Sequence, residues 1–175
     1  MNIFYLDRDP VLAAQMQCDK HVVKMILESA QLLCTAHRIL DGDGAGADAI
    51  GLYKIAHKNH PSAIWARDRQ ANYNWLFTHM KALMAEYTYR YDGKHHKSEF
   101  LLEYIESCPM SLMTCKLPFT PPPQCGMSDK YKSDDAVLAY QLYYVFEKTS
   151  MCNGTGPQWG KTREAPNWYK EKVHA

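Results

Sequence analysis

The fold of this chain is decided by residues 9–38, whose sequence is DPVLAAQMQCDKHVVKMILESAQLLCTAHR. Asp9 followed by Pro10 is a typical helix start, because Asp caps free N–H groups and proline has no N–H to leave unpaired there. The apolar residues that follow recur every three or four positions, at Val11, Ala14, Cys18, Val22, Met25, Ile26, Leu33 and Ala36. This pattern predicts one long helix from Val11 to about Arg38.

The rest of the chain predicts further helices. A second long helix is expected after the turn at residues 57–62, with Ser62 as its N-cap, because apolar and aromatic residues again repeat at helical spacing. Shorter helices are expected over about 98–107 and, capped within Ser133–Asp135, to about residue 148. No useful length of β-alternation is present. We predict a mostly α, single-domain bundle of about four helices spanning residues 1–175.

Two segments are expected to be irregular. Residues 109–128 contain five prolines, which predicts a long loop, and loops of this length inside a domain are often functional. The tail from Asn153 is rich in Gly, Pro and Trp. Its adjacent aromatics, Trp168 and Tyr169, either dock on the domain or form the edge of a ligand site.

Composition restricts the class of protein. The 175 residues are 46% hydrophobic, which suits a globular domain and excludes a disordered chain. No apolar run approaches the roughly 20 residues of a membrane span, and the first ten residues lack the pattern of a secretory signal. We therefore expect a cytoplasmic monomer whose six scattered cysteines are reduced. The net charge is +1, so a nucleic-acid surface must be local.

A polar stripe lies beside the apolar face of the first helix. Its residues are spaced by three and four and are Gln17, His21, Lys24, Glu28, Gln31 and Thr35. The simplest interpretation is a solvated face with a Lys24–Glu28 ion pair. The grouping of His, Lys and Glu next to apolar positions also predicts a partly buried carboxylate that acts as a general acid or base.

Basic and aromatic residues are mixed between Lys54 and Phe100. This stretch has eight Lys or Arg and five His against four Asp or Glu, with several Trp and Tyr among them. Such a mixture is typical of surfaces that bind phosphates and unstacked bases. An ordinary helix surface over an aromatic core gives the same pattern.

A zinc site is the alternative interpretation of the histidines. His57 and His60 are three apart and would have to join Cys18 and His21. Zinc sites usually have more closely spaced ligand pairs, so His60 is more simply a cap or packing residue at the start of the second helix.

Three motifs resemble, in order, those of the pyrimidine dimer DNA glycosylase family. That family has Asp-x-His on its first long helix and an essential glutamate seven residues after the histidine, matched here by Asp19–His21 and Glu28. Its C-terminal Pro-x-Trp-Tyr-Lys segment is matched by Pro166–Lys170. The matches in and around the second helix are His60, Trp65, Arg69, Leu76, Glu86, Arg90 and Gly93. The opening also resembles phage-encoded proteins, so we expect a distant phage-encoded member acting in the host cytoplasm.

The resemblance implies an enzyme that binds double-stranded DNA at a damaged or modified pyrimidine. It also implies that a free α-amine attacks C1′ of the deoxyribose, that a Schiff base forms and the base leaves, and that β-elimination nicks the strand. An α-amine suits this role because its ordinary pKa of about 7.7–8.0 leaves roughly 10% neutral at pH 7, against well under about 0.1% for lysine. The target nucleotide has to leave the base stack. We expect no cofactor and no metal.

The resemblance assigns roles to particular residues. Because Asn2 is large, we expect Met1 to be retained and to supply the amine, with Glu28 as acid or base and His21 nearby. Lys24 is the alternative nucleophile if burial lowers its pKa. The residues expected to contact DNA are Asp19, His60, Arg67, Arg69, Lys81, Trp168, Tyr169 and Lys170. A relative that binds or modifies DNA without lyase chemistry is the other nucleic-acid alternative.

Overall fold

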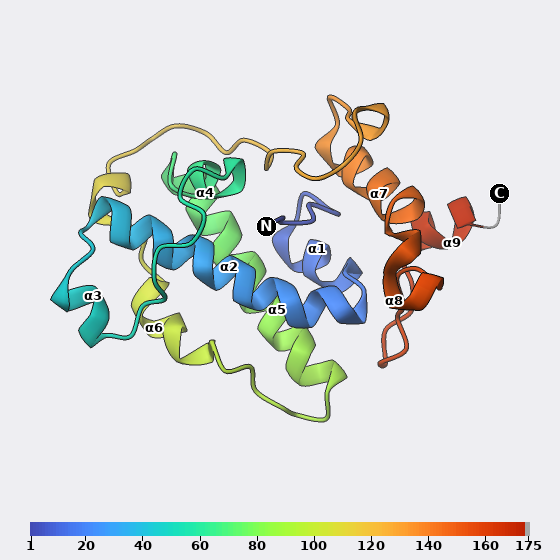
Figure 1. Ribbon diagram of the computed structural model, residues 1–175, viewed down its shortest axis with the longest axis horizontal. Helices are drawn as coiled ribbons and strands as arrows, with labels where there is room; N and C mark the ends of the chain where they lie inside the picture. The colour runs from blue at the N-terminus through green and yellow to red at the C-terminus, as the bar shows by residue number, and fades with distance from the viewer. Residues whose placement is uncertain (174–175) are drawn as a thin grey trace.

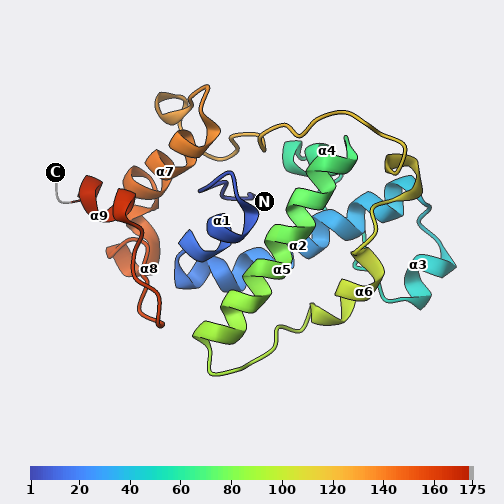
Figure 2. The same cartoon turned by 180° about the vertical axis from the view of Figure 1, so that it is seen from behind.

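The computed structural model describes residues 1–173, and helices are the only regular secondary structure in this range (Figure 1). The prediction of a mostly α fold is confirmed. Two long helices, α2 (Asp19–Leu40) and α5 (Gln70–Arg90), cross and pack together, and α1 (Pro10–Met16) also packs on α5 (Figures 1 and 2). The other helices are α3 (Ala45–Ala49), α4 (Pro61–Ala66), α6 (Leu102–Ile105), α7 (Ala136–Phe146), α8 (Met151–Gly154) and α9 (Asn167–Val173), with 3-10 turns η1 (Glu99–Leu101), η2 (Met110–Leu112), η3 (Asp129–Tyr131) and η4 (Lys148–Ser150).

The first predicted helix is two helices, so the prediction of an unbroken helix over 11–38 is wrong. Asp9 caps α1 as expected, since its carboxylate accepts the N–H groups of Val11 and Leu12. The chain is extended at Gln17 and Cys18 before α2 begins. The guanidinium of Arg90 causes this break, because it donates to the carbonyls of residues 15 and 17 at 2.8 Å. A side chain from α5 thus satisfies carbonyls that a continuing helix would have used.

The second predicted helix is also divided, into α4 and α5. Its N-cap is His60, whose Nδ1 accepts the N–H of Ser62 at 3.1 Å, so Ser62 is not the cap and the capping role expected for His60 is confirmed. Pro61 explains this position, because proline favours the first helical residue and the cap precedes it. At the break, the Asn72 side chain donates to the carbonyl of Trp65 at 3.2 Å and closes α4.

The proline-rich loop and the tail enclose one end of the molecule. The loop passes α4 and runs above the N-terminus to α7 (Figure 1). Asp135 caps α7, as the sequence predicts. The tail is not wholly irregular, because it includes α9. The carbonyl of Pro166 accepts two N–H groups of the first turn of α9. Trp168 packs edge-on against Tyr144, with ring centroids 6.2 Å apart.

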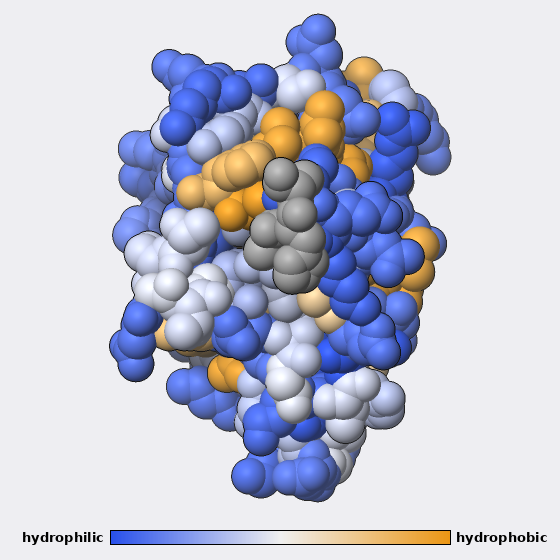
Figure 3. Space-filling model, turned by 90° about the vertical axis from the view of Figure 1, so that its right-hand side faces the viewer, coloured by the Kyte–Doolittle hydropathy of each residue, from blue (hydrophilic) through white to orange (hydrophobic). Residues whose placement is uncertain are grey.

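A single hydrophobic cluster joins these elements. It includes side chains from the N-terminus, α2, α5 and α7, and the large rings of Tyr73, Tyr140 and Tyr144 are fully buried in it. The end formed by α7 to α9 presents a mostly hydrophilic surface, on which hydrophobic residues form a few separate groups (Figure 3). Among the described helices, none has the length and apolar character needed to cross a bilayer.

Candidate active site

The first residues of the chain are buried between α2 and the proline-rich loop. The backbone N–H of Asn2 donates to Glu28 Oε2 at 3.1 Å. The Asn2 side chain donates to the carbonyl of Cys125 at 2.7 Å and accepts the N–H of Ile3 at 2.8 Å. Asn2 is only 8% exposed, so its side chain holds the N-terminus in one position beside the helix carboxylate.

A cavity of about 220 Å³ lies where the N-terminus meets α2 and α7. Its walls come from four separate parts of the chain. They are formed by Met1, Asn2, Phe4, His21, Lys24, Met25, Glu28, Gly126, Tyr143 and Lys148. The structure therefore brings together the four residues to which the sequence assigns chemistry, which are Met1, His21, Lys24 and Glu28.

The Glu28 carboxylate is held from two sides. Its Oε2 accepts the N–H of Asn2, and its Oε1 lies 3.3 Å from Lys24 Nζ. The Glu28 side chain is 14% exposed, whereas that of Lys24 is 64% exposed. One largely shielded carboxylate thus faces the same cavity as the first residue of the chain.

His21 is a buried, neutral side chain. Its ring stacks on Phe4 with centroids 4.1 Å apart, and its Nδ1 forms a hydrogen bond with the Tyr144 hydroxyl. Burial, together with the positive charges of Lys148, Lys24 and Lys20, lowers the pKa of His21 to about 3. At neutral pH His21 therefore offers no positive charge to a phosphate.

His60 lies close to the same group of charges. Burial lowers the pKa of His60, and the charges of the N-terminal amine and of His57 lower it further, whereas the Glu28 carboxylate opposes this shift. Both the chain terminus and Glu28 are therefore near enough to His60 to act on it electrostatically.

Part of the cavity comes from residues that sequence reasoning did not select. Lys148 Nζ lies 4.4 Å from the ring centroid of Tyr143 and 5.5 Å from that of Phe4. Gly126 has a φ of +73°, which favours glycine, and a Cβ there would meet the Tyr143 hydroxyl at 3.4 Å. No local motif marks these positions. Gly126 lies in the predicted loop, and Tyr143 and Lys148 belong to a predicted helix whose pattern indicates only packing.

Comparison with known proteins agrees with the resemblance seen in the motifs. The sequence model of the pyrimidine dimer DNA glycosylase family matches residues 1–99, more than half of the chain. The chain belongs to this family. Family membership implies a pyrimidine dimer DNA glycosylase that binds DNA and acts in DNA repair. No curated protein and no solved structure gives a significant match to the chain.

The family match covers only part of the cavity. It includes Met1, His21, Lys24 and Glu28, and it ends before Gly126, Tyr143 and Lys148. The side of the cavity formed by α7 and its flanking turns therefore belongs to this chain's own C-terminal part.

Three basic residues that were expected to bind DNA lie outside the cavity walls: Arg67 and Arg69, between α4 and α5, and Lys81 on α5. Arg67 donates to the carbonyl of Lys58 at 2.7 Å. Arg69 pairs with Asp68 at 2.6 Å and donates to a loop carbonyl. Lys81 is exposed and lines a separate groove on α5.

Asp19 and the C-terminal aromatics have internal partners. Asp19 Oδ1 pairs with Arg90 at 3.0 Å, and its Oδ2 accepts the N–H of Gly160 at 2.7 Å. Tyr169 packs on Trp159 with centroids 4.7 Å apart. Lys170, next to it, pairs with Glu164 at 2.6 Å. None of these residues, nor Trp168, lines the cavity.

The zinc alternative has no site in residues 1–173. No three His, Cys, Asp or Glu side chains in this range are arranged to hold a metal ion. The set of Cys18, His21, His57 and His60 is therefore not brought together, and the metalloprotein interpretation is wrong for this part of the chain.

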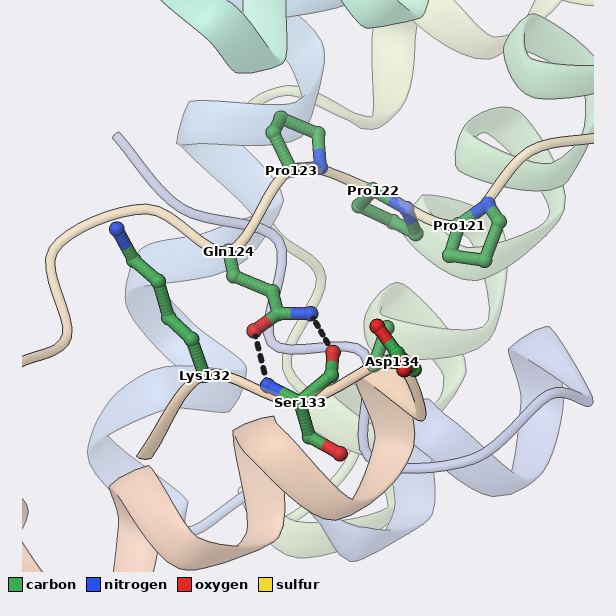
Figure 4. A pocket seen from close by; sticks show the side chains of 8 residues that line it. Pro121, Pro122, Pro123, Gln124, Lys132, Ser133 and Asp134 are labelled. Atoms are coloured by element: carbon green, nitrogen blue, oxygen red, sulfur yellow. Dashed lines mark hydrogen bonds between the residues drawn. The ribbon is translucent and has the colours of Figure 1, made fainter. Parts of the chain in front are cut away.

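A second hollow is lined by Pro121–Pro123, Gln124 and residues 132–134 and 136, and it shares no lining residue with the cavity (Figure 4). Here the Gln124 amide forms two hydrogen bonds with the backbone of Ser133, accepting its N–H at 3.0 Å and donating to its carbonyl (Figure 4). This clamp fixes the segment that leads directly into Cys125 and Gly126 at the cavity.

Proposed function

We propose that this chain removes a damaged pyrimidine from double-stranded DNA and then cleaves the strand at the same nucleotide. Family membership supports the glycosylase step. The lyase step is supported by one observation above all: Met1 and Glu28 line the same cavity, where the N–H of the next residue donates to Glu28 Oε2 at 3.1 Å.

The chemistry begins at the α-amine of Met1. The neutral amine attacks C1′ of the target deoxyribose, and the bond to the base breaks with its electron pair leaving on the base. Loss of a proton from nitrogen leaves Met1 bonded to C1′ of the closed sugar ring. The C1′–O4′ bond then breaks, O4′ takes up a proton, and the nitrogen lone pair forms the C=N bond of a protonated Schiff base between Met1 and C1′. A proton is then removed from C2′ and the C3′–O bond breaks, with the electron pair leaving on the phosphate oxygen. Water hydrolyses the Schiff base and frees the amine.

Glu28 is the group that moves protons in this scheme. Its carboxylate is shielded, and it is held in position by the Asn2 N–H and by Lys24. A positioned carboxylate can take up the proton that the attacking amine releases, pass it to the leaving base, and later remove the C2′ proton. His21 is neutral and hydrogen bonded to Tyr144, so its role is to support the cavity beside Phe4 rather than to bind a phosphate.

Lys24 is the competing amine. Its Nζ is paired with Glu28 Oε1, which favours Met1, because a lysine attacks only from its deprotonated state. In this assignment Lys24 orients the carboxylate and faces the DNA from an exposed position.

Borohydride trapping tests the proposal. Protein with its N-terminus verified by intact mass is mixed with a duplex containing an abasic site, and the Schiff base is reduced. We expect a covalent adduct that peptide mapping places on Met1, and Lys24→Met should still form it. A chain acetylated at its N-terminus should not. An adduct on Lys24, or DNA binding with no adduct at all, would overturn the proposal.

A further inference from the structure

Lys148 occupies an unusual place for a surface cation. It follows α7 and lines the cavity together with Met1 and Glu28. Its ammonium lies over the rings of Tyr143 and Phe4, at 4.4 and 5.5 Å from their centroids. The aromatic rings fix where the positive charge sits.

The charge of Lys148 is not matched by an acid in the described part of the chain. Within residues 1–173 it forms no ion pair. The neighbouring acid, Glu147, instead accepts the N–H of Ser128 at 2.9 Å. The other lysine of the cavity, Lys24, is paired with Glu28. Of the two lysines that line the cavity, Lys148 is therefore the one without an anionic partner in this range.

We propose that Lys148 binds a DNA phosphate adjacent to the sugar on which Met1 acts. This inference rests on the proposed function, because a sugar placed at Met1 and Glu28 brings its flanking phosphates to the same cavity. Lysine is a flexible point charge that suits a single phosphate oxygen. Lys148 lies outside residues 1–99, which the family model matches, and outside the three motifs, so neither assigns this contact.

Three variants separate this role from simple packing. Lys148→Met keeps the aliphatic stem over the rings and removes the charge, and Lys148→Arg restores the charge. Lys161→Met is the matched control, since Lys161 also lies over an aromatic ring, that of Tyr91 at 5.8 Å, but does not line the cavity. Thermal unfolding checks that each variant is folded.

The first measurement is binding to a duplex with a non-reactive abasic analogue over a range of salt concentrations. We expect Lys148→Met to weaken binding about tenfold at low salt and to reduce the slope of log K against log salt by about 1. Lys148→Arg should stay within about twofold of the unaltered protein.

The second measurement identifies the phosphate. A neutral methylphosphonate replaces the phosphate on the 5′ or the 3′ side of the analogue. With one of the two methylphosphonate duplexes, Lys148→Met should no longer weaken binding, because the phosphate that Lys148 contacts is already uncharged. The effect of Lys161→Met on binding should be the same for all the duplexes. The inference would be overturned if Lys148→Met weakened binding fully on both methylphosphonate duplexes, or did not weaken binding to the duplex with unmodified phosphates. Borohydride trapping by the unaltered protein reports separately on the proposed function.

Discussion

Replacing Glu28 with glutamine is expected to separate catalysis from stability. Glutamine has nearly the same size, and its carbonyl oxygen can still accept the N–H of Asn2, which is 3.1 Å away. The variant loses the negative charge that pairs with Lys24 at 3.3 Å. It also loses the ability to take up and release a proton.

The structure sets different magnitudes for the two losses. The Lys24 side chain is 64% exposed, so water screens the pair and its loss costs at most about 1 kcal/mol of unfolding free energy. Acid–base catalysis by a positioned side chain contributes about 10²–10⁴ in rate, equivalent to roughly 2.7–5.5 kcal/mol in the barrier. Glu28→Gln should therefore remain folded while strand cleavage falls by at least about a hundredfold.

Single-turnover cleavage of a duplex with an abasic site, at saturating protein, measures the barrier, and urea unfolding measures stability. Lys24→Met is the matched control, because it breaks the same ion pair and keeps the carboxylate. It should lose a similar, small amount of stability and retain most of the cleavage rate. Cleavage by Glu28→Gln within about threefold of the unaltered protein would refute the assignment of Glu28 as the proton-transfer group.

Three further predictions concern pH, the tail and the chain terminus. Burial lowers the pKa of His21 from its ordinary 6.5 to about 3, so below pH 6.5 the unfolded chain binds a proton that the folded chain does not. The unfolding free energy should fall by roughly 2 kcal/mol between pH 8 and pH 5 from this group alone, and urea unfolding of His21→Phe should show a loss smaller by that amount. Arg163→Met removes one of the two cations that pair with buried Glu86; the guanidinium of Arg163 lies 2.6 Å from Glu86 Oε1. This change should lower the free energy of unfolding, measured in urea, by about 1–3 kcal/mol. An unchanged urea midpoint would contradict this prediction. In a chain that begins at Asn2, the α-amine is the nitrogen that lies 3.1 Å from Glu28, so borohydride should still trap this chain on DNA. A chain extended before Met1 should not be trapped. Equal trapping of the extended chain would argue against the terminal amine as the nucleophile.

Two helix starts were predictable from sequence, and the helix breaks were not. Asp9 and Asp135 cap helices through contacts with residues two or three positions away, so their effect is local. The break at Gln17 depends instead on Arg90, which lies 73 residues further along the chain. Because Cys18 continues the apolar spacing from Ala14 to Val22 across the break, periodicity alone cannot detect it.

The candidate site was predictable on one side only. His21, Lys24 and Glu28 share a face of α2, and helical spacing groups them without any tertiary information. Tyr143 and Lys148 reach the same cavity only because the proline-rich loop returns the chain past the N-terminus. That return depends on long-range contacts, such as the bond from the Asn2 side chain to the Cys125 carbonyl, which have no sequence spacing to identify them.

The motif shared with the family combines a structural residue with chemical ones. Asp19 is engaged on both carboxylate oxygens, by Arg90 of α5 and by the backbone of Gly160 in the tail. These contacts fix the first turn of α2, and because a helix is rigid over two turns, they also fix where Glu28 lies relative to the N-terminus. The tail therefore acts on the cavity without entering it: a change that frees Asp19 should move Glu28 away from the Asn2 N–H and reduce activity before it unfolds the chain.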